Sequence, residues 1–415
     1  MIGHIEEGRR IDKAVCGSAQ TFAIKGVELV DARGVIPHSW VSVVDGAIDA
    51  SGTFDDDLAT HIEMMGGADH IRVIDGQGAW LAPGYVDIHA HGAWECSFDD
   101  GAAAIAVARA WHMNHGTTRQ VLSLITNPLD VMCANLAVVA RETSRRPDVL
   151  GAHLEGPFLA LGRKGAHDPN CLVDPTPGRV DALLEAADGC LRQITIAPER
   201  EYGLEAISRF AGAGVTPAVG HCDADYDTAR RAFDRGARIM THMFNAMNGM
   251  HHREPGPIPA AVNDSRIIIE LINDGFHVRN PMVALGMSMA PGRVAFVTDA
   301  MAATGCADGA YKLGALDVAV VDGHARLISN GAIAGSTLTL EVAVQRAVKE
   351  LGTGLPDAIA AVTLTPARAI GLDRPNAITG APLGLVAAGY AADLLLLDPA
   401  TLSVDHVWCA GRSIR

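Results

Sequence analysis

Five short segments of this chain each carry side chains that can bind a metal ion or transfer a proton, directly after a run of apolar or β-branched residues. The segments are Asp87-Ile88-His89-Ala90-His91, His153-Leu154-Glu155-Gly156-Pro157, Gly220-His221, Thr241-His242 and Val297-Thr298-Asp299. When parallel strands close into a barrel, their carboxyl ends meet at one face, where such enzymes carry their catalytic groups. The segments therefore indicate a metal site at the mouth of a barrel, and they favour a metal-assisted hydrolase.

His89 and His91 are separated by one residue at the end of an extended apolar segment, residues 83–88. Side chains two positions apart on a strand lie on the same face. Both imidazoles are therefore expected to face the barrel axis and to chelate one ion. A pair of histidines in a surface loop is the alternative, and the apolar segment before the pair makes ligation the favoured interpretation.

Glu155 ends the apolar segment 150–154 and is followed by Gly156-Pro157, a pair that stops a strand and turns the backbone. Taken alone, a glutamate at a strand end is best interpreted as half of a salt bridge. Beside the histidine segments, a carboxylate that binds one ion or bridges two is the better interpretation. The chain has no lysine between Lys164 and Lys312. A carboxylated lysine that bridges two metal ions is therefore excluded on the fourth to eighth strands. Glu155 is the remaining candidate for the bridging ligand.

His221 and His242 end two further apolar segments, residues 215–220 and 238–241. Either histidine alone would be a weak signal, because histidines with satisfied hydrogen bonds are common in protein cores. Two histidines at successive strand ends are hard to attribute to coincidence. We expect both to be imidazole ligands from adjacent strands.

Asp299 ends the last apolar segment, residues 294–298. A carboxylate at this place can bind the metal, accept a proton from an attacking water and later deliver it. The alternative is that Asp299 caps a helix that begins at residues 300–303. A buried position that faces the metal is expected to dominate.

The elements that position these groups alternate between strand-like and helix-like patterns from about residue 85 to residue 372. The candidate strands are residues 85–89, 117–124, 150–154, 193–197, 216–220, 239–241, 267–271 and 293–298. Helical spacing appears at residues 101–115, 129–141, 203–211, 225–235, 281–290 and 338–351. Eight strands alternating with helices predict an α/β fold of the (β/α)8 TIM-barrel type. A doubly wound open sheet is the alternative, and it would bind ligands at a single switch point.

Both ends of the chain are rich in strand patterns instead. Residues 21–30, 40–44, 71–74, 392–397 and 404–409 are β-branched or apolar, and Asp45-Gly46 is a hairpin signal. We expect a small β-sandwich domain from residues 21–83 and 375–415, with the barrel at 84–374. Residues 1–20 are polar, without the apolar region of a signal peptide, and are expected to form a flexible extension.

The composition is that of an ordinary globular protein, with 49% hydrophobic and 20% charged residues. A net charge of −15 without a basic stripe argues against a nucleic-acid partner. No apolar run reaches the roughly 18 residues of a membrane helix, so no membrane partner is expected. The eight cysteines have no CxxC pair, which favours reduced thiols and a cytoplasmic location.

The chain resembles the amidohydrolase superfamily and, within it, the N-acetylglucosamine-6-phosphate deacetylase family. The resemblance runs from about Val27 to the C-terminus. It rests on residues 83–92, 151–158, 164–170, 219–224, 241–247, 253–256, 273–278, 297–300 and 335–340. It implies a barrel with a small β-sandwich formed by both termini, in agreement with the pattern of elements.

The resemblance also implies a ligand set for one or two divalent ions per subunit. Glu155, His221 and His242 match the ligands of the main metal, and His89 and His91 match members that bind a second ion with Asp299. Asp299 matches the catalytic acid and base. The mixed imidazole and carboxylate ligands make zinc the first expectation, with iron, cobalt, manganese and cadmium as alternatives.

Five further positions match substrate contacts of that family. His167 matches a contact to a sugar hydroxyl that also helps to polarise the amide. Asn245 and Ala246 match backbone donors to the phosphate, and His277 matches a phosphate-binding side chain. Arg253 matches a phosphate ligand from the neighbouring subunit, which implies a homodimer. Without the resemblance, Arg253 would be interpreted as a surface ion pair with a neighbouring acid such as Glu254.

The function implied is hydrolysis of the acetamido group of N-acetyl-D-glucosamine 6-phosphate to D-glucosamine 6-phosphate and acetate, in amino-sugar catabolism and cell-wall recycling. Another metal amidohydrolase, acting on a cyclic amide or an N-acyl amino acid, is the alternative among enzymes. A non-catalytic assembly protein on the same barrel is the alternative from a different class, and it would be expected to have lost the ligands.

Overall fold

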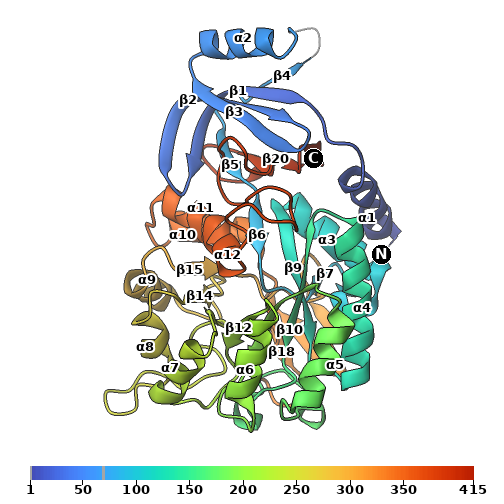
Figure 1. Cartoon of the computed structure of the whole chain (residues 1–415), viewed down its shortest axis with the longest axis vertical. Coiled ribbons are helices and arrows are strands. Elements are labelled where there is room, and N and C mark those ends of the chain that lie inside the picture. The colour runs from blue at the N-terminus through green and yellow to red at the C-terminus, as the bar shows by residue number, and fades with distance from the viewer. Residues whose placement is uncertain (1, 68–70) are drawn as a thin grey trace.

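Eight parallel strands form the centre of the molecule in the computed structural model, which describes residues 2–67 and 71–415 (Figure 1). They are β6 (Tyr85–Asp87), β9 (Thr117–Ile125), β10 (Val149–Glu155), β11 (Leu191–Ile196), β12 (Thr216–Val219), β13 (Ile239–Met240), β14 (Ile268–Leu271) and β15 (Val294–Phe296). Each strand pairs with the next one along the chain. Every candidate strand from the sequence is present.

The two outer strands of this sheet, β15 and β6, meet through the residues that follow them. The backbone N–H of Asp299 donates to the carbonyl of His89 at 2.8 Å, and the Thr298 hydroxyl donates to Asp87 Oδ2 at 2.6 Å. The strand order never reverses, so there is no switch point of the kind that defines a doubly wound sheet. The predicted (β/α)8 barrel is confirmed.

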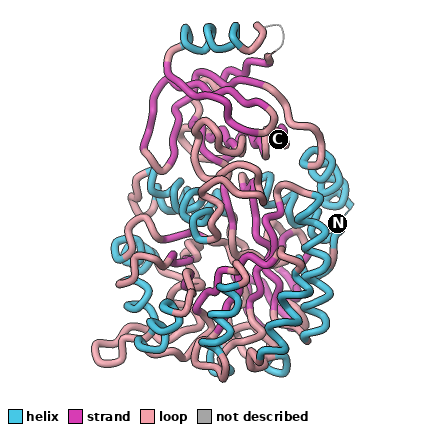
Figure 2. Tube along the Cα trace, in the orientation of Figure 1, coloured by secondary structure: helices cyan, strands magenta, loops and turns pink. Residues whose placement is uncertain are grey.

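Helices cover the outside of the barrel, as Figure 2 shows. They are α3 (Ala102–Asn114), α4 (Leu129–Arg145), α5 (Pro177–Ala187), α6 (Gly203–Gly212), α7 (Tyr226–Asp234), α8 (Pro257–Val262), α9 (Asn280–Met289), α10 (Leu340–Lys349), α11 (Leu355–Val362) and α12 (Leu364–Ala369). Helix α10 illustrates why they form: Thr339 caps it by accepting from the N–H of Val342, and its buried positions recur at helical spacing.

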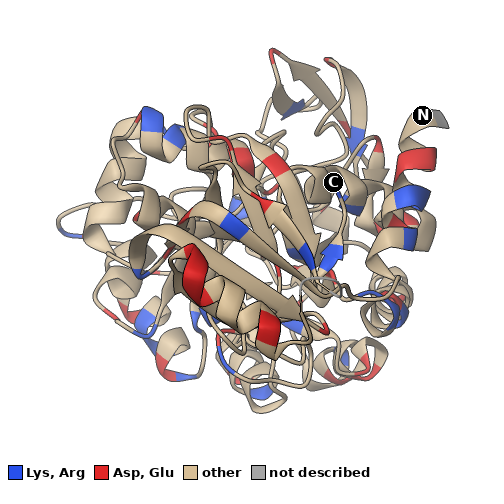
Figure 3. Ribbon diagram, turned by 90° about the horizontal axis from the view of Figure 1, so that it is seen from above, with Lys and Arg blue, Asp and Glu red and all other residues tan. Residues whose placement is uncertain are grey.

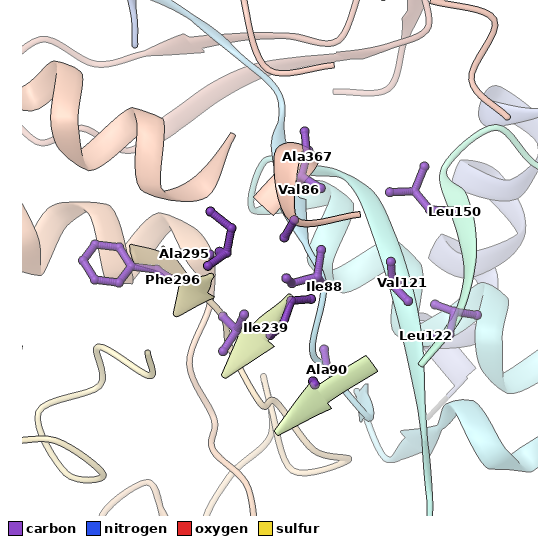
Figure 4. Packing of buried hydrophobic residues seen from close by; sticks show 14 of the residues in the cluster. Val86, Ile88, Ala90, Val121, Leu122, Leu150, Ile239, Ala295, Phe296 and Ala367 are labelled. Carbon is purple, nitrogen blue, oxygen red and sulfur yellow. The ribbon is translucent and has the colours of Figure 1, made fainter. Parts of the chain in front are cut away.

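Side chains on both faces of the barrel strands are buried, polar ones as well as apolar ones. All nine residues of β9 are buried. Figure 4 shows Val86 and Ile88 packed near Val121, Ile239 and Ala295, which come from other strands. A packed interior of this kind fixes the positions of the strand ends, where the ionisable side chains lie.

A second sheet is built from both ends of the chain and lies above the barrel in Figure 1. Its strands are β1 (Phe22–Asp31), β2 (Gly34–Val44), β3 (Ala47–Thr53), β4 (Arg72–Asp75), β5 (Trp80–Pro83), β19 (Leu394–Leu397), β20 (Val404–Cys409) and β21 (Arg412–Ser413). The order is β21-β20-β19-β5-β1-β2-β3, with β4 paired to β1, and its mainly antiparallel pairing agrees with the expected small β domain. Residues 68–70 of that expected domain lie outside the described residues.

Helix α2 (Asp55–Met64) lies on the far side of this sheet from the barrel. Figure 3, which looks down on this end of the molecule, shows acidic residues at both ends of the helix. Asp55, Asp56 and Asp57 occupy the first turn, where negative charge is favourable beside the helix dipole.

The start of the chain corrects the expectation of a flexible extension. Ile2–Val15 form helix α1, which packs against α3. The side chains of Ile11 and Val15 are fully buried, and Gly8 lets the helix approach Val107 closely. Asp12 accepts from Arg145 at 2.8 Å and from Arg146 at 2.9 Å. The apolar stripe of α1 is short and is embedded among charged residues, so the sequence pattern was weak; residue 1 lies outside the described residues.

A three-stranded antiparallel sheet that the sequence pattern did not reveal follows the last barrel strand. It consists of β16 (Gly309–Leu313), β17 (Leu316–Val321) and β18 (His324–Leu327). Smaller elements are β7 (Gly92–Ala93), β8 (Cys96–Ser97) and the 3-10 helices η1 (Phe98–Asp100), η2 (Leu161–Arg163) and η3 (Pro169–Cys171). Among the residues that the structure describes, none of the helices has the length and apolar composition needed to cross a membrane.

Candidate metal and catalytic site

A cavity of about 310 Å³ opens at the carboxyl ends of the barrel strands. All of the expected site residues except His89 and Arg253 line it, so the structure brings together residues from seven segments of the chain. His89 lies directly beneath the cavity and is fully buried. Ile125, Leu313 and Ile333 give the cavity an apolar wall.

The Glu155 carboxylate lies at the centre of the ionisable groups. The distances from its Oε1 atom to Nε2 atoms are 3.0 Å for His221, 3.2 Å for His242 and 3.3 Å for His89. The distances from its Oε2 atom to Nε2 atoms are 3.1 Å for His91 and 3.3 Å for His167. Burial alone would raise the pKa of Glu155, but the surrounding imidazoles outweigh burial and hold the pKa well below its usual range.

The arrangement of these groups fits one or two divalent cations. His89, His91, Glu155 and Asp299 place one ligand atom each within 4.8 Å of the others, and Glu155, His221 and His242 do the same. The Nε2 atoms of His221 and His242 lie only 3.0 Å apart. Two imidazole nitrogens directed at one carboxylate oxygen form a donor set suited to zinc or iron, and Glu155 is shared by both groups.

Hydrogen bonds on the far side of two imidazoles fix which nitrogen is free. His221 Nδ1 lies 2.8 Å from the carbonyl of Arg163, an oxygen that can only accept, so Nδ1 carries the proton and Nε2 is left with a lone pair. His89 Nδ1 lies 3.0 Å from Glu270 Oε2 and is fixed in the same way. Contacts of this kind orient metal-binding histidines.

Four of the expected site residues have left-handed backbone conformations. The φ angles are 47° for His221, 24° for His242, 49° for Ala246 and 48° for Asp299. Such residues cost about 1–3 kcal/mol each and cluster where function requires a particular geometry. Gly165 allows the close approach of His221, because a Cβ atom at this glycine would lie 3.2 Å from His221 Cε1.

Asp299 lies at the edge of the group, where it reaches both the buried imidazoles and the cavity. Its Oδ1 atom is 3.4 Å from His91 Nε2 and 3.6 Å from His89 Nε2. Its side chain keeps 12% of its surface exposed. The alternative of a helix cap is wrong, because residues 302–305 form a turn rather than a helix and the Asp299 carbonyl accepts from the backbone N–H of Ser336.

His167 is buried against the same carboxylate. Burial lowers its pKa to about 4 in spite of the nearby charge on Glu155. The Thr126 hydroxyl donates its proton to the Glu155 carbonyl at 2.7 Å, so it accepts from His167 Nδ1 at 2.9 Å. The Nε2 atom of a neutral His167, 3.3 Å from Glu155 Oε2, is then an acceptor, and the residue lines the cavity.

The expected phosphate contacts divide into two places. Asn245, Ala246 and His277 line the cavity. His277 Nδ1 lies 2.6 Å from Asp274 Oδ2, which fixes the orientation of its ring. Arg253 is exposed and lines a different cavity of about 630 Å³.

Within the described part of the chain Arg253 forms no ion pair, and the expected alternative of a pair with Glu254 is absent; its Nη1 atom lies 2.8 Å from His252 Nε2.

Sequence reasoning missed two residues of this region. Glu270 is a fully buried carboxylate in the otherwise apolar segment 267–272, and that isolation was the available signal. Among the described residues, Arg163 is the one arginine or lysine that lines the cavity, and its Nε atom lies 2.6 Å from Asp223 Oδ1. Its signal was its place in the Arg163-Lys164-Gly165 stretch before His167.

Comparison with known proteins identifies the relatives of this arrangement. The profile described as "Amidohydrolase family" matches residues 80–414. The N-acetylgalactosamine-6-phosphate deacetylase of Escherichia coli O157:H7 is 34% identical over 94% of this chain and 99% of its own length. The N-acetylglucosamine-6-phosphate deacetylase of Vibrio furnissii is 30% identical over 88% of this chain and 90% of its own.

Among solved structures, the N-acetyl-D-glucosamine-6-phosphate deacetylase of Mycobacterium smegmatis is 36% identical to this chain and superimposes with a TM-score of 0.86. The superposition covers 95% of this chain and 100% of that one. A mutant form of the Mycobacterium smegmatis enzyme in complex with N-acetyl-D-glucosamine-6-phosphate superimposes with the same TM-score.

Proposed function

This chain belongs to the amidohydrolase family, and from that premise we propose that it hydrolyses the acetamido group of N-acetyl-D-glucosamine 6-phosphate, releasing D-glucosamine 6-phosphate and acetate. The observation that carries the proposal is the buried Glu155 cluster with Asp299 at the edge of a cavity. The cavity volume of about 310 Å³ is at the small end of the usual range for small-molecule sites, roughly 300–1,000 Å³.

Glu155, His221 and His242 are the proposed ligands of the main metal ion. His89, His91 and Asp299 are the proposed ligands of a second ion that shares Glu155. Zinc is the first candidate, ahead of iron, cobalt, manganese and cadmium. A divalent ion bound here would supply a Lewis acid that polarises the amide carbonyl and lowers the pKa of the attacking water.

Asp299 is the proposed proton carrier. Its carboxylate accepts a proton from the attacking water and then delivers the proton to the amide nitrogen, since an amine leaves readily only when it is protonated. Its side chain is partly exposed, and its Oδ1 atom lies 3.4 Å and 3.6 Å from two imidazole nitrogens. This position supports contact with both the attacking water and the amide nitrogen. His167 accepts a hydrogen bond from a sugar hydroxyl through Nε2 and thereby orients the ring of the substrate.

The phosphate is assigned to the other end of the cavity. The backbone N–H groups of Asn245 and Ala246 and the ring of His277 are its proposed donors within one subunit. Arg253 is proposed to reach the phosphate of a partner subunit in a homodimer, where its planar guanidinium pairs well with phosphate oxygens. Its exposure and its freedom from ion pairs with the described residues support that role.

N-Acetyl-D-galactosamine 6-phosphate is the second candidate substrate, because the Escherichia coli relative named for it is 34% identical over nearly its whole length. The two sugars differ only in the configuration at C4. A cyclic amide, an N-acyl amino acid or a purely structural role has no comparable support. The cytoplasm, with amino-sugar catabolism and cell-wall recycling, is the proposed setting, and the eight free thiols are consistent with it.

Acetate release tests this proposal. Purified protein is assayed with the 6-phosphates of both N-acetyl sugars, with unphosphorylated N-acetylglucosamine, and with each in the presence of a chelator. Chelator-sensitive release from the phosphosugars, and much slower release from the free sugar, is expected. A preference for the unphosphorylated sugar would refute the phosphate contacts, and release that ignores the chelator would refute the metal.

A further inference from the structure

Glu270 carries a carboxylate into the interior of the barrel, beneath the site described above. It lies on β14, is fully buried, and is flanked by isoleucine and leucine. A buried charge of this kind is costly unless every oxygen has a partner. Its Oε1 atom accepts from Gln193 Nε2 at 2.6 Å. Its Oε2 atom accepts from His89 Nδ1 at 3.0 Å and from the backbone N–H of His242 at 3.3 Å.

The contact with His89 decides the state of that imidazole. A carboxylate oxygen accepts, so Nδ1 carries the proton, and in the neutral imidazole that binds a cation Nε2 keeps its lone pair. The Nε2 atom lies 3.3 Å from Glu155 Oε1 and 3.6 Å from Asp299 Oδ1. Glu270 therefore selects the form of His89 that can bind a cation, and its negative charge makes the nitrogen a stronger ligand.

The contact with His242 extends the same carboxylate to the other ligand group. His89 belongs to the group of His91, Glu155 and Asp299, whereas His242 belongs to the group of Glu155 and His221. Glu155 joins the two groups from the cavity side. Glu270 joins them from the opposite side, through a side chain in one case and the backbone in the other.

We propose that Glu270 is a positioning residue for a two-cation centre: it holds His89 in its cation-binding form, and Gln193 holds Glu270. This inference rests on the proposed function, in which a metal-dependent hydrolase uses Glu155 as a ligand shared by two ions. It adds that the second ion depends on a residue that touches neither the ions nor the substrate.

Glu341 provides a matched control, because it makes the same kinds of contact elsewhere. Its Oε2 atom accepts from His115 Nδ1 at 2.5 Å, and its Oε1 atom accepts from the backbone N–H of Val404 at 2.8 Å. Neither Glu341 nor His115 lines the cavity. If these carboxylate–imidazole pairs only stabilise the fold, substitution of Glu341 is expected to affect metal binding as much as substitution of Glu270.

The test measures metal binding in the full chain. Zinc content is determined after equilibration, and the dissociation constant of each ion is measured by competition with a chromophoric chelator. The unaltered protein is expected to bind two ions. Glu270→Gln is expected to bind one of them about 10–100-fold more weakly, because an amide has a single acceptor oxygen for three donors. Glu341→Gln is expected to bind both ions normally.

A double-mutant cycle with His89→Asn separates positioning from general damage. If Glu270 acts through His89, Glu270→Gln adds little to the loss that His89→Asn already causes. If Glu270→Gln does not fold, Gln193→Met replaces it in the same measurements. This substitution removes the partner of Glu270 Oε1 alone, so a smaller loss of ion binding is expected.

Binding of a single ion by the unaltered protein would overturn the proposal, as would unchanged binding by Glu270→Gln or equal losses in the Glu341 control. None of these measurements uses the sugar, so they stand or fall separately from the proposed substrate.

Discussion

The Nε2 atoms of His221 and His242 lie 3.0 Å apart, and each is within 3.2 Å of Glu155 Oε1. His221 already donates through Nδ1 to a backbone carbonyl, so a neutral His221 offers only a lone pair at Nε2. Convergence of this nitrogen, a second imidazole and a carboxylate oxygen creates a donor set suited to a divalent cation.

Removal of the metal is the first prediction. Dialysis against a chelator is expected to abolish acetate release, and zinc is expected to restore it. His242→Asn should lower the activity by more than roughly 100-fold, the loss typical for residues that only orient a metal ligand. It should also contain less zinc by elemental analysis. His406→Asn, at an exposed position on β20, is the control and should behave as the unaltered protein does. Full activity of His242→Asn would remove it from the ligand set.

Asp299→Asn is expected to lower kcat by at least about 100-fold, because the amide cannot accept the proton of the attacking water. Binding of substrate, measured by calorimetry, should persist, since Asp299 is not among the proposed phosphate contacts Asn245, Ala246 and His277. Asp405→Asn removes an exposed carboxylate from β20 and should leave kcat unchanged. Near-normal turnover by Asp299→Asn would end its assignment as the proton carrier.

Arg253 gives a prediction about two subunits. If its guanidinium serves the neighbouring active site, Arg253→Met and Asp299→Asn subunits are each impaired alone. A mixed dimer contains one site with an intact Asp299 and an intact Arg253 from the partner. Co-refolding the two variants is therefore expected to regain part of the activity, measured against each variant refolded alone. No regain from dimers shown to be mixed would place Arg253 outside the partner's site.

Asp148 governs a prediction about stability. It accepts from Arg109 at 3.0 Å and from Arg146 at 2.9 Å, and all three are buried. Burial alone would raise the pKa of Asp148, but the two guanidiniums outweigh it and hold the pKa well below its ordinary value. The stability that the two ion pairs of Asp148 contribute is thus fully present above the pKa of Asp148 in the unfolded chain, about 3.9. It is lost as pH falls further.

Asp148→Asn is accordingly expected to lower the free energy of unfolding at pH 7 by about 3–5 kcal/mol, since it leaves the buried guanidinium of Arg109 without a carboxylate and that of Arg146 with Asp12 alone. Urea unfolding measures the change. Asp317→Asn, which breaks an exposed pair with Lys312, should cost less than about 1 kcal/mol. Equal effects of the two substitutions would contradict the analysis, as would a deficit in Asp148→Asn that does not shrink below about pH 3.9.

His112 predicts a different pH window. Burial, with the charge of Arg109, lowers its pKa to about 3, and its Nε2 lies 3.1 Å from the Gly92 carbonyl. Below about pH 6.5 the unfolded chain takes up a proton that the folded protein does not. Stability is therefore lost as pH falls from about 6.5 to 3, by up to about 1.4 kcal/mol per pH unit.

His112→Gln should flatten this dependence, measured as urea midpoints between pH 7 and 4 with chelator present throughout, so that release of metal does not contribute. His406→Gln, at an exposed position, should retain the full slope. An unchanged slope in His112→Gln would show that other groups take up the proton.

The barrel and most of its site could be predicted because most of the strands are local apolar runs, and five of them end in or are directly followed by ionisable residues. This pattern identified Glu155, His221 and Asp299. Glu270 could not be identified in this way, because its role depends on contacts with Gln193 and His89, which lie 77 and 181 positions away in the sequence. Helix α1 was missed for a related reason: its buried face is recognisable only against α3.

The place of β19 in the small sheet has a consequence for synthesis. Residues 394–397 lie between β20 and β5, so one edge of β5 stays unpaired until these residues have been made. The barrel segment precedes that moment and can form first. A chain cut short before Leu394 would expose the free edge of β5, the kind of edge that pairs with other chains and aggregates. Synthesis of β19 is therefore the step that covers this edge of β5.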